Sequence, residues 1–236
     1  MSRTGIHSLI VALCLLGALS FSRPAMADPV TMTFVTEYNA GAVLGGVYDD
    51  PYWVLIDGIP TLAICDDFFT EVHAGQTWSA DVYTLSDIGT SGPQKFTGAP
   101  VPYTIQQEYN AAGLLAEDLM ASLNDPTLVG EYSYAIWTLF DPSAIWGHDG
   151  SATNPYLTPT QQDDVNTLRT AALTAVLQGV TPSDSIFIYT PDPKNASQEF
   201  LVVKTPEASV LVFLALDLAA LLGLALLIRR KSAAQN

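Results

Sequence analysis

Residues 52–69 read YWVLIDGIPTLAICDDFF, two largely apolar runs on either side of the pair Asp57-Gly58. This pair favours a two-residue β-hairpin turn, because Asp and Gly both tolerate the positive φ angles that such a turn needs. We therefore expect strands at Tyr52–Ile56 and Thr61–Phe69. The hairpin predicts that the domain is built on an antiparallel sheet.

Other segments before and after this hairpin alternate between apolar and polar residues, a pattern typical of half-buried strands. The expected strands are Thr31–Tyr38, Val43–Tyr48 with a turn or bulge at Gly45-Gly46, Thr77–Leu85, Ser185–Thr190 and Gln198–Lys204. Trp53 and Trp78 on strands, and Trp137 on a helix, fit core positions.

Three helices are expected between the strands Thr77–Leu85 and Ser185–Thr190. The first carries apolar residues at helical spacing from Ile105 to Leu123. The second begins at Asp125-Pro126 and ends at Asp141-Pro142, and the third begins with a capping box at Thr158–Gln161 and ends at Gly179. The fold class is α+β, an antiparallel β-sheet core, sandwich or barrel-like, with a helical insertion of about three helices.

The first 27 residues have the pattern of a secretory signal peptide, with Arg3, a short apolar run and the cleavage site Ala25-Met26-Ala27. Residues 28–204 then form one acidic exported domain. Between Asp28 and Glu207 there are 23 acidic and four basic residues, a net charge of −19. A domain this acidic is not expected to bind nucleic acid, which requires clustered Lys and Arg.

The chain closes with residues 205–231, TPEASVLVFLALDLAALLGLALLIRRK, followed by a short tail, 232–236. The apolar run 208–228 is long enough for a helix of roughly 32 Å, which crosses a bilayer core of about 30 Å. Basic residues after it, Arg229, Arg230 and Lys231, predict a cytoplasmic membrane stop. One C-terminal transmembrane helix therefore completes the expected fold.

This tail resembles the PEP-CTERM sorting signal of exported bacterial proteins, in which a Pro-Glu-Pro motif precedes a transmembrane helix and an Arg-rich end. Pro206, Glu207 and Arg229-Arg230 match that pattern, and Ala208 stands in place of the third motif residue. The resemblance implies that signal peptidase and an exosortase-type membrane transpeptidase are partners, with cleavage near Pro206-Glu207. The alternative is a simple membrane anchor that is never cut.

Signatures of catalysis are absent from the sequence, which contains no H-E-x-x-H, G-x-S-x-G, P-loop or G-x-G-x-x-G motif. No catalytic residue, metal site or cofactor is therefore expected. Three acidic pairs, Asp49-Asp50, Asp66-Asp67 and Asp163-Asp164, are interpreted as solvated faces. Cys14 leaves with the signal peptide, so Cys65 is the one cysteine of the mature domain and no internal disulfide can form.

The segments Leu62–Cys65 and Tyr134–Trp137 together resemble the thioester domains of bacterial surface adhesins. In that family the cysteine is cross-linked to a glutamine two residues before the Ala of an Ala-Ile-Trp helix, a position that Ser133 occupies here. Serine has no carboxamide that could acylate sulfur. Gln106, Gln107 and Gln162 are spare candidates. Cys65 is thus either a candidate reactive thiol or a small buried residue beside Trp137.

A loop from Asp141 to Leu157 holds Trp146, His148 and Tyr156. Trp146 could be exposed and stack on a sugar ring, or it could pack onto the domain as a loop anchor. Stacking on a sugar would agree with the PEP-CTERM resemblance, which implies a link to exopolysaccharide production.

The sequence predicts an exported, membrane-anchored and non-enzymatic envelope or matrix protein that serves adhesion or biofilm association. It could also be processed to the cell surface. One alternative is a covalent adhesin that uses a thioester at Cys65. Another is an envelope hydrolase with an active site around His148 and an acidic partner.

Overall fold

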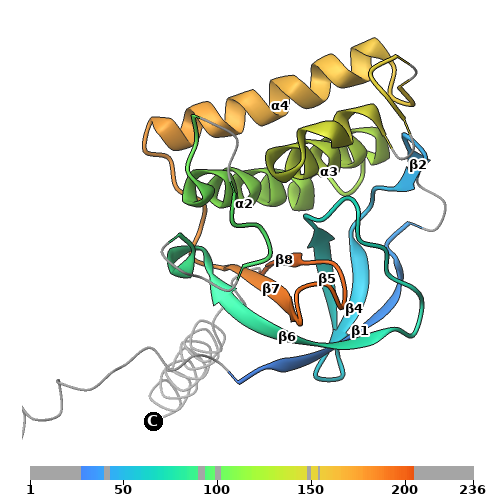
Figure 1. Cartoon of the computed structure of the whole chain (residues 1–236), viewed down its shortest axis with the longest axis vertical. Coiled ribbons are helices and arrows are strands. Elements are labelled where there is room, and N and C mark those ends of the chain that lie inside the picture. The colour runs from blue at the N-terminus through green and yellow to red at the C-terminus, as the bar shows by residue number, and fades with distance from the viewer. Residues whose placement is uncertain are drawn as a thin grey trace, which may run out of the picture.

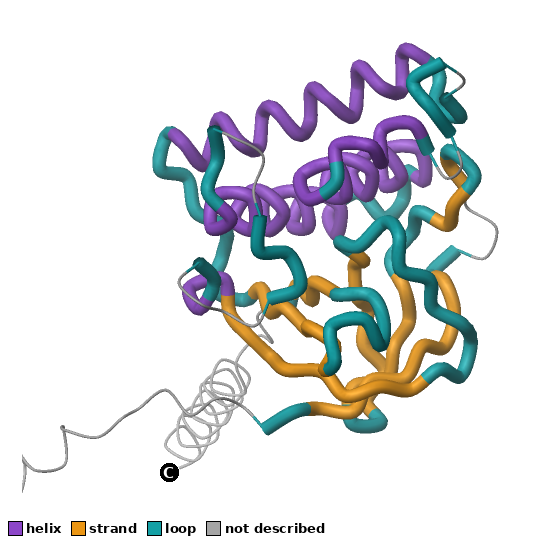
Figure 2. Tube along the Cα trace, viewed as in Figure 1, coloured by secondary structure: helices purple, strands orange, loops and turns teal. Residues whose placement is uncertain are grey.

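The computed structural model describes residues 28–39, 43–89, 94–98, 102–147, 150–153 and 155–204. These ranges form two layers, a β-barrel and a layer of three helices packed against one side of it (Figure 1). Figure 2 shows the separation of helices from strands. No helix in these ranges combines the length and apolar character that crossing a bilayer requires. The predicted signal peptide and the predicted span at 208–228 lie outside the described residues.

Six antiparallel strands close the barrel in the order β1-β4-β5-β8-β7-β6. Their bounds are β1 Val30–Glu37, β4 Tyr52–Ile56, β5 Ile59–Cys65, β6 Thr77–Thr84, β7 Ile186–Asp192 and β8 Phe200–Val203. Pairing of β1 with β6 closes the ring, with Met32 opposite Trp78. A separate hairpin consists of β2 Val43–Leu44 and β3 Val47–Tyr48. The sheet predicted from sequence is therefore confirmed, in its barrel form.

The β4–β5 hairpin turns at Asp57-Gly58, as predicted, with φ angles of 48° and 82°. Asp57 also exchanges bonds with Thr31 of β1: its carboxylate accepts from the Thr31 N–H and its own N–H donates to the Thr31 carbonyl, both at 2.8 Å. The second arm is Ile59–Cys65 rather than Thr61–Phe69. It starts earlier because the turn contains only Asp57 and Gly58, so Ile59 already pairs with Ile56. It ends at Cys65, and Asp66 and Asp67 belong to the loop that follows.

The helical layer consists of α2 Ile105–Ala121, α3 Pro126–Phe140 and α4 Pro159–Leu177, with short 3₁₀ helices η1 Leu85–Asp87 and η2 Pro142–Trp146. The predicted starts of α3 and α4 are confirmed. Asp125 accepts a bond from the Leu128 N–H at 3.2 Å, and Thr158 and Gln161 form a capping box. α4 packs on α2 and α3 and lies farthest from the barrel (Figure 1).

Two apolar clusters share the barrel wall. The barrel interior holds Met32, Phe34, Tyr52, Val54, Ala63, Cys65, Trp78, Ala80, Tyr189, Phe200 and Val202. The second cluster joins the helices to the outer faces of β5, β7 and β8, through Ile64, Ile188 and Leu201 among others. β7, β8 and the C-terminal end of β5 are largely buried on both faces, which explains their nearly continuous apolar sequences.

One core prediction is wrong. Trp53 is 36% exposed and lies on the outer face of β4, where its ring is 6.4 Å from that of Tyr38. Successive side chains of a strand point to opposite faces. Tyr52 and Val54 occupy the barrel interior, so Trp53 between them must point outward. Trp78 and Trp137 are buried, as predicted.

Candidate ligand-binding cleft

Cys65 is the last residue of β5, and its side chain lies in the barrel interior with 4% exposure. Its thiol donates to the carbonyl of Asp67 at 3.1 Å, and its sulfur accepts from the Asp67 N–H at 3.3 Å. Trp137 of α3 donates its indole N–H to the Cys65 carbonyl at 2.9 Å. Burial, followed by the nearby Asp67 and Asp66, raises the pKa of the thiol well above its ordinary value. This placement favours the inert interpretation, a small buried residue beside Trp137.

Ser133 lies on α3, one turn before Trp137, and is buried. Its hydroxyl donates to the carbonyl of Asp49, so the side chain ties α3 to the segment after β3. The position where the resemblance implies glutamine thus has a structural contact of its own.

The three spare glutamines bond elsewhere. Gln106 donates to the Leu85 carbonyl at 2.7 Å and Gln162 to the Leu157 carbonyl at 2.9 Å. Gln107 accepts from the Thr104 N–H at 2.9 Å as part of a helix cap. A different glutamine lies near the thiol.

Gln198 lies in the β7–β8 connection, two residues before β8. Its amide donates to the Asp67 carbonyl at 3.4 Å, the same oxygen that accepts from Cys65. Sequence reasoning missed this residue because only the pairing of β5 with β8 brings the start of β8 beside the end of β5. No spacing along the chain indicates that approach.

The interpretation of the acidic pairs as solvated faces is wrong for two of them. Asp49, Asp50, Asp66 and Asp67 are each at most 4% exposed, whereas Asp163-Asp164 is exposed. Such burial of carboxyl groups requires compensating partners.

Asp67 has a charged partner from a segment distant in sequence, and Asp66 lies beside Glu199. Asp67 forms an ion pair with Lys95, whose ammonium also donates to the Ser197 carbonyl at 2.7 Å. Glu199 accepts bonds from Tyr109, from Thr190 and, at 2.8 Å, from the Lys95 N–H. Burial and the charge of Glu199 raise the pKa of Asp66 well above its ordinary value. We interpret this buried network as a structural joint between β8, α2 and the segment 94–98.

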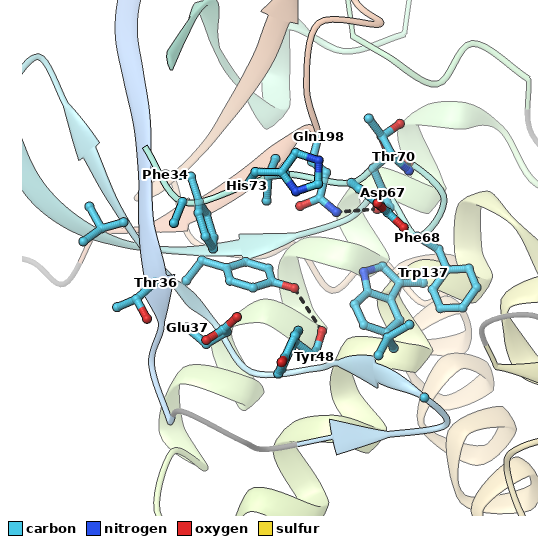
Figure 3. Close-up of a pocket in the computed structure, with 17 residues that line it drawn as sticks. Phe34, Thr36, Glu37, Tyr48, Asp67, Phe68, Thr70, His73, Trp137 and Gln198 are labelled. Atoms are coloured by element: carbon cyan, nitrogen blue, oxygen red, sulfur yellow. Dashed lines mark hydrogen bonds between the residues drawn. The ribbon is translucent and has the colours of Figure 1, made fainter. Parts of the chain in front are cut away.

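A cleft of about 510 Å³ lies beside Trp137 and Asp67 (Figure 3). It is lined by residues 34–37 of β1, 46–48 around β3, Tyr52, 67–68 and 70–74 of the loop after β5, Trp137 and Gln198. Its volume falls within the range of roughly 300–1,000 Å³ that is typical of small-ligand sites. The barrel, the β2–β3 hairpin and α3 therefore combine to form one concave surface.

Aromatic rings make up much of the cleft wall. The ring centroids of Phe34 and Tyr52 are 5.4 Å apart, and those of Phe68 and Trp137 are 5.2 Å apart. The Tyr52 hydroxyl donates to the carbonyl of Tyr48 at 2.9 Å, which joins β4 to the β2–β3 hairpin (Figure 3). Tyr48 itself is 50% exposed.

Polar groups occur at two depths in the cleft. Glu37 is partly exposed, and Glu71 and His73 are exposed, so these three form a rim. Asp67 and Gln198 are buried at its inner end. Within the described ranges, no group of three or more His, Cys, Asp or Glu side chains is arranged to hold a metal ion.

The structure places Trp146 at the end of η2, where it is partly buried against the helical cluster and not in the cleft. Its carbonyl accepts from the Tyr156 N–H at 2.9 Å. This placement favours the loop-anchor interpretation over a stacking surface. His148, Pro206, Glu207, Arg229, Arg230 and Lys231 lie outside the described residues. Comparison with known proteins found no family model, curated protein or solved structure that matches this chain.

Proposed function

We propose that the chain is an exported, non-enzymatic cell-envelope protein, tethered by its C-terminal segment, whose domain binds a ligand in the cleft and thereby serves adhesion or matrix association. The cleft is the observation that carries the proposal. It combines aromatic walls with a small number of polar groups, the composition typical of ligand sites. Cys65, the one cysteine between Asp28 and Glu207, is buried and does not line the cleft, and its burial raises the pKa of the thiol well above its ordinary value.

Sequence features at the two ends support export and tethering. An A-x-A cleavage site precedes Asp28, and the apolar run 208–228 is followed by the basic residues 229–231. The test is the intact mass of the protein recovered from the envelope and from the medium of a bacterium that has an exosortase. We expect an N-terminus near Asp28 and, if the sorting signal is processed, a C-terminus near Pro206-Glu207. The double variant Pro206→Ala/Glu207→Ala should retain the tail and remain in the membrane fraction.

A result against this proposal would be the full chain, with both ends intact, in the cytosol of the producing cells. Retention of the tail in the unaltered protein, with the protein in the envelope, would instead support a simple anchor. The first outcome tests export, and the second tests whether the C-terminal tail is cleaved.

A second candidate function, the covalent adhesin, is favoured by the approach of Gln198 to Cys65 at the Asp67 carbonyl. In that reaction the Cys65 sulfur would bond to the Gln198 carboxamide carbon, and the amide nitrogen would leave as ammonia with the thiol proton. We prefer the non-covalent function because burial disfavours the thiolate. Intact mass decides between them, since the thioester lowers the mass by one ammonia and Cys65→Ala abolishes that difference.

A further inference from the structure

The strongest unexplained feature of the cleft is the side-chain carbonyl of Gln198. Among the described residues, none donates a hydrogen bond to its Oε1 atom, although Gln198 is only 8% exposed and lines the cleft. The amide nitrogen bonds to Asp67, so Oε1 is directed away from that contact (Figure 3). A buried acceptor without a donor destabilises the folded protein, because the acceptor has lost its water and gained no partner. A ligand that supplies an O–H or N–H group would remove this cost.

We propose that the cleft binds an uncharged oligosaccharide, with a sugar hydroxyl donating to Oε1 of Gln198 and a sugar ring stacked on Tyr48. The proposal rests on the proposed function and specifies the ligand class of the same site. Tyr48 suits stacking because it lies on the short strand β3 at the cleft edge with half of its surface exposed. Trp137 and Phe68 are too deeply buried for stacking and form an apolar floor.

Charge excludes acidic ligands. The domain carries a net charge of −19 between Asp28 and Glu207, and Glu37 and Glu71 add negative charge at the rim. A polymer of uronic acids or a sulfated sugar would be repelled both at long range and at contact. The ligand must therefore be neutral or positively charged.

The inner end of the cleft distinguishes a neutral sugar from a basic peptide. Asp67, the deep carboxylate, already pairs with Lys95, and the remaining deep acceptor is the neutral amide of Gln198. A lysine ammonium placed there would lose water without meeting an uncompensated negative charge. A hydroxyl would be satisfied by an amide acceptor, so the site is better matched to a neutral sugar.

Binding to the full chain in detergent micelles tests the proposal by isothermal titration calorimetry. The probes are a panel of neutral hexamers, built of β-linked glucose, mannose, galactose and N-acetylglucosamine, together with a galacturonate hexamer and hexalysine. We expect at least one neutral hexamer to bind and galacturonate not to bind. Tyr48→Ala should weaken binding roughly two- to tenfold, as loss of one aromatic contact implies.

Tyr156→Ala is the matched control, because Tyr156 is also an exposed tyrosine, at 55%, but lies outside the cleft. Gln198→Met should weaken binding by about tenfold. Unchanged melting temperatures of Tyr48→Ala and Tyr156→Ala will show that the domain remains folded.

Three outcomes would overturn the proposal: no binding to any neutral hexamer, stronger binding of hexalysine than of every sugar, or equal effects of Tyr48→Ala and Tyr156→Ala. The location of the protein in the envelope does not depend on these results. Failure of sugar binding with correct export would therefore refute the ligand class alone.

Discussion

The indole N–H of Trp137 donates to the carbonyl of Cys65 at 2.9 Å, which fixes α3 to the end of β5. Both residues are buried, and Trp137 also forms the floor of the cleft. The contact therefore links the helical layer, the barrel and the candidate site in one place.

Replacing Trp137 should destabilise the domain. Trp137→Phe removes the donor to Cys65 and some buried contact area, so we expect the free energy of unfolding to fall by about 1–3 kcal/mol. Trp53→Phe is the control, because Trp53 lies on the outer face of the barrel and its replacement should change stability by less than about 0.5 kcal/mol. Urea titration measures both. Equal stability of the two variants would show that the bond contributes nothing.

The thiol of Cys65 should react slowly in the folded state. With Cys14 replaced by Ser in the full chain, one thiol remains to be followed. We expect a thiol reagent at neutral pH to modify it quickly in urea and only on the time scale of unfolding in buffer, because the thiol is buried and protonated. Fast and complete modification of the folded protein would contradict this prediction.

Gly130 on α3 should not tolerate alanine. Alanine normally stabilises a helix interior by about 0.5–1 kcal/mol over glycine. A Cβ atom at Gly130, however, would lie 2.2 Å from Oδ2 of Asp49. We expect a net loss of about 1–3 kcal/mol in the free energy of unfolding for Gly130→Ala. Gly98→Ala serves as the control and should be nearly neutral, because no heavy atom of the residues that the structure describes lies within 4 Å of the new Cβ.

Stability should decrease as pH rises from mildly acidic to neutral values. Burial raises the pKa of Asp49 and of Glu108 to about 7, from ordinary values of 3.8 and 4.5. Because the raised pKa belongs to the folded state, the stabilising effect of protonation is fully present below about pH 4 and is lost as pH rises through about 7. Denaturant titrations at several pH values should show this decline.

The double variant Asp49→Asn/Glu108→Gln should flatten that dependence. Asp163→Asn, on the exposed face of α4, should leave it unchanged. If the slope of stability against pH is the same in all three proteins, these carboxyl groups are not its origin.

Lys95 should be essential to the buried acidic network. Lys95→Met leaves the Asp67 carboxylate buried without its cation, and we expect a loss of about 3–5 kcal/mol in the free energy of unfolding. Asp67→Asn in the Lys95→Met background should recover part of that loss, because the uncompensated charge is then gone. An unchanged or larger loss in the double variant would argue for a packing effect instead.

Local structure was predictable because its causes are local. The turn at Asp57-Gly58 and the capping box at Thr158–Gln161 depend on residues only a few positions apart. The class of the fold follows from the order of these elements. The sequence did not decide between a sandwich and a closed barrel. Closure depends on the pairing of β1 with β6, some 50 residues later, and no local pattern indicates that pairing.

The site was less predictable because its contacts are long-range. Asp66 and Asp67 have the sequence pattern of a solvated pair. In the structure the buried Asp67 pairs with Lys95, whereas burial and the charge of Glu199 raise the pKa of Asp66 and so favour its neutral form. Gln198 likewise reaches Cys65 through the β5–β8 pairing. Cys65 and Trp137 were recognised together from a resemblance, whereas the cleft that Trp137 lines is formed by segments far apart in the sequence.

Closure of the sheet also limits how copies of this domain can associate when they are crowded on a surface. Every strand of the six-stranded ring has a hydrogen-bonded neighbour on both sides, so the paired part of each strand is not available for the addition of a foreign strand. Fibre growth by strand addition is thereby suppressed. Contacts between neighbouring copies of the barrel must be made through side chains, whose strong negative charge keeps the copies apart.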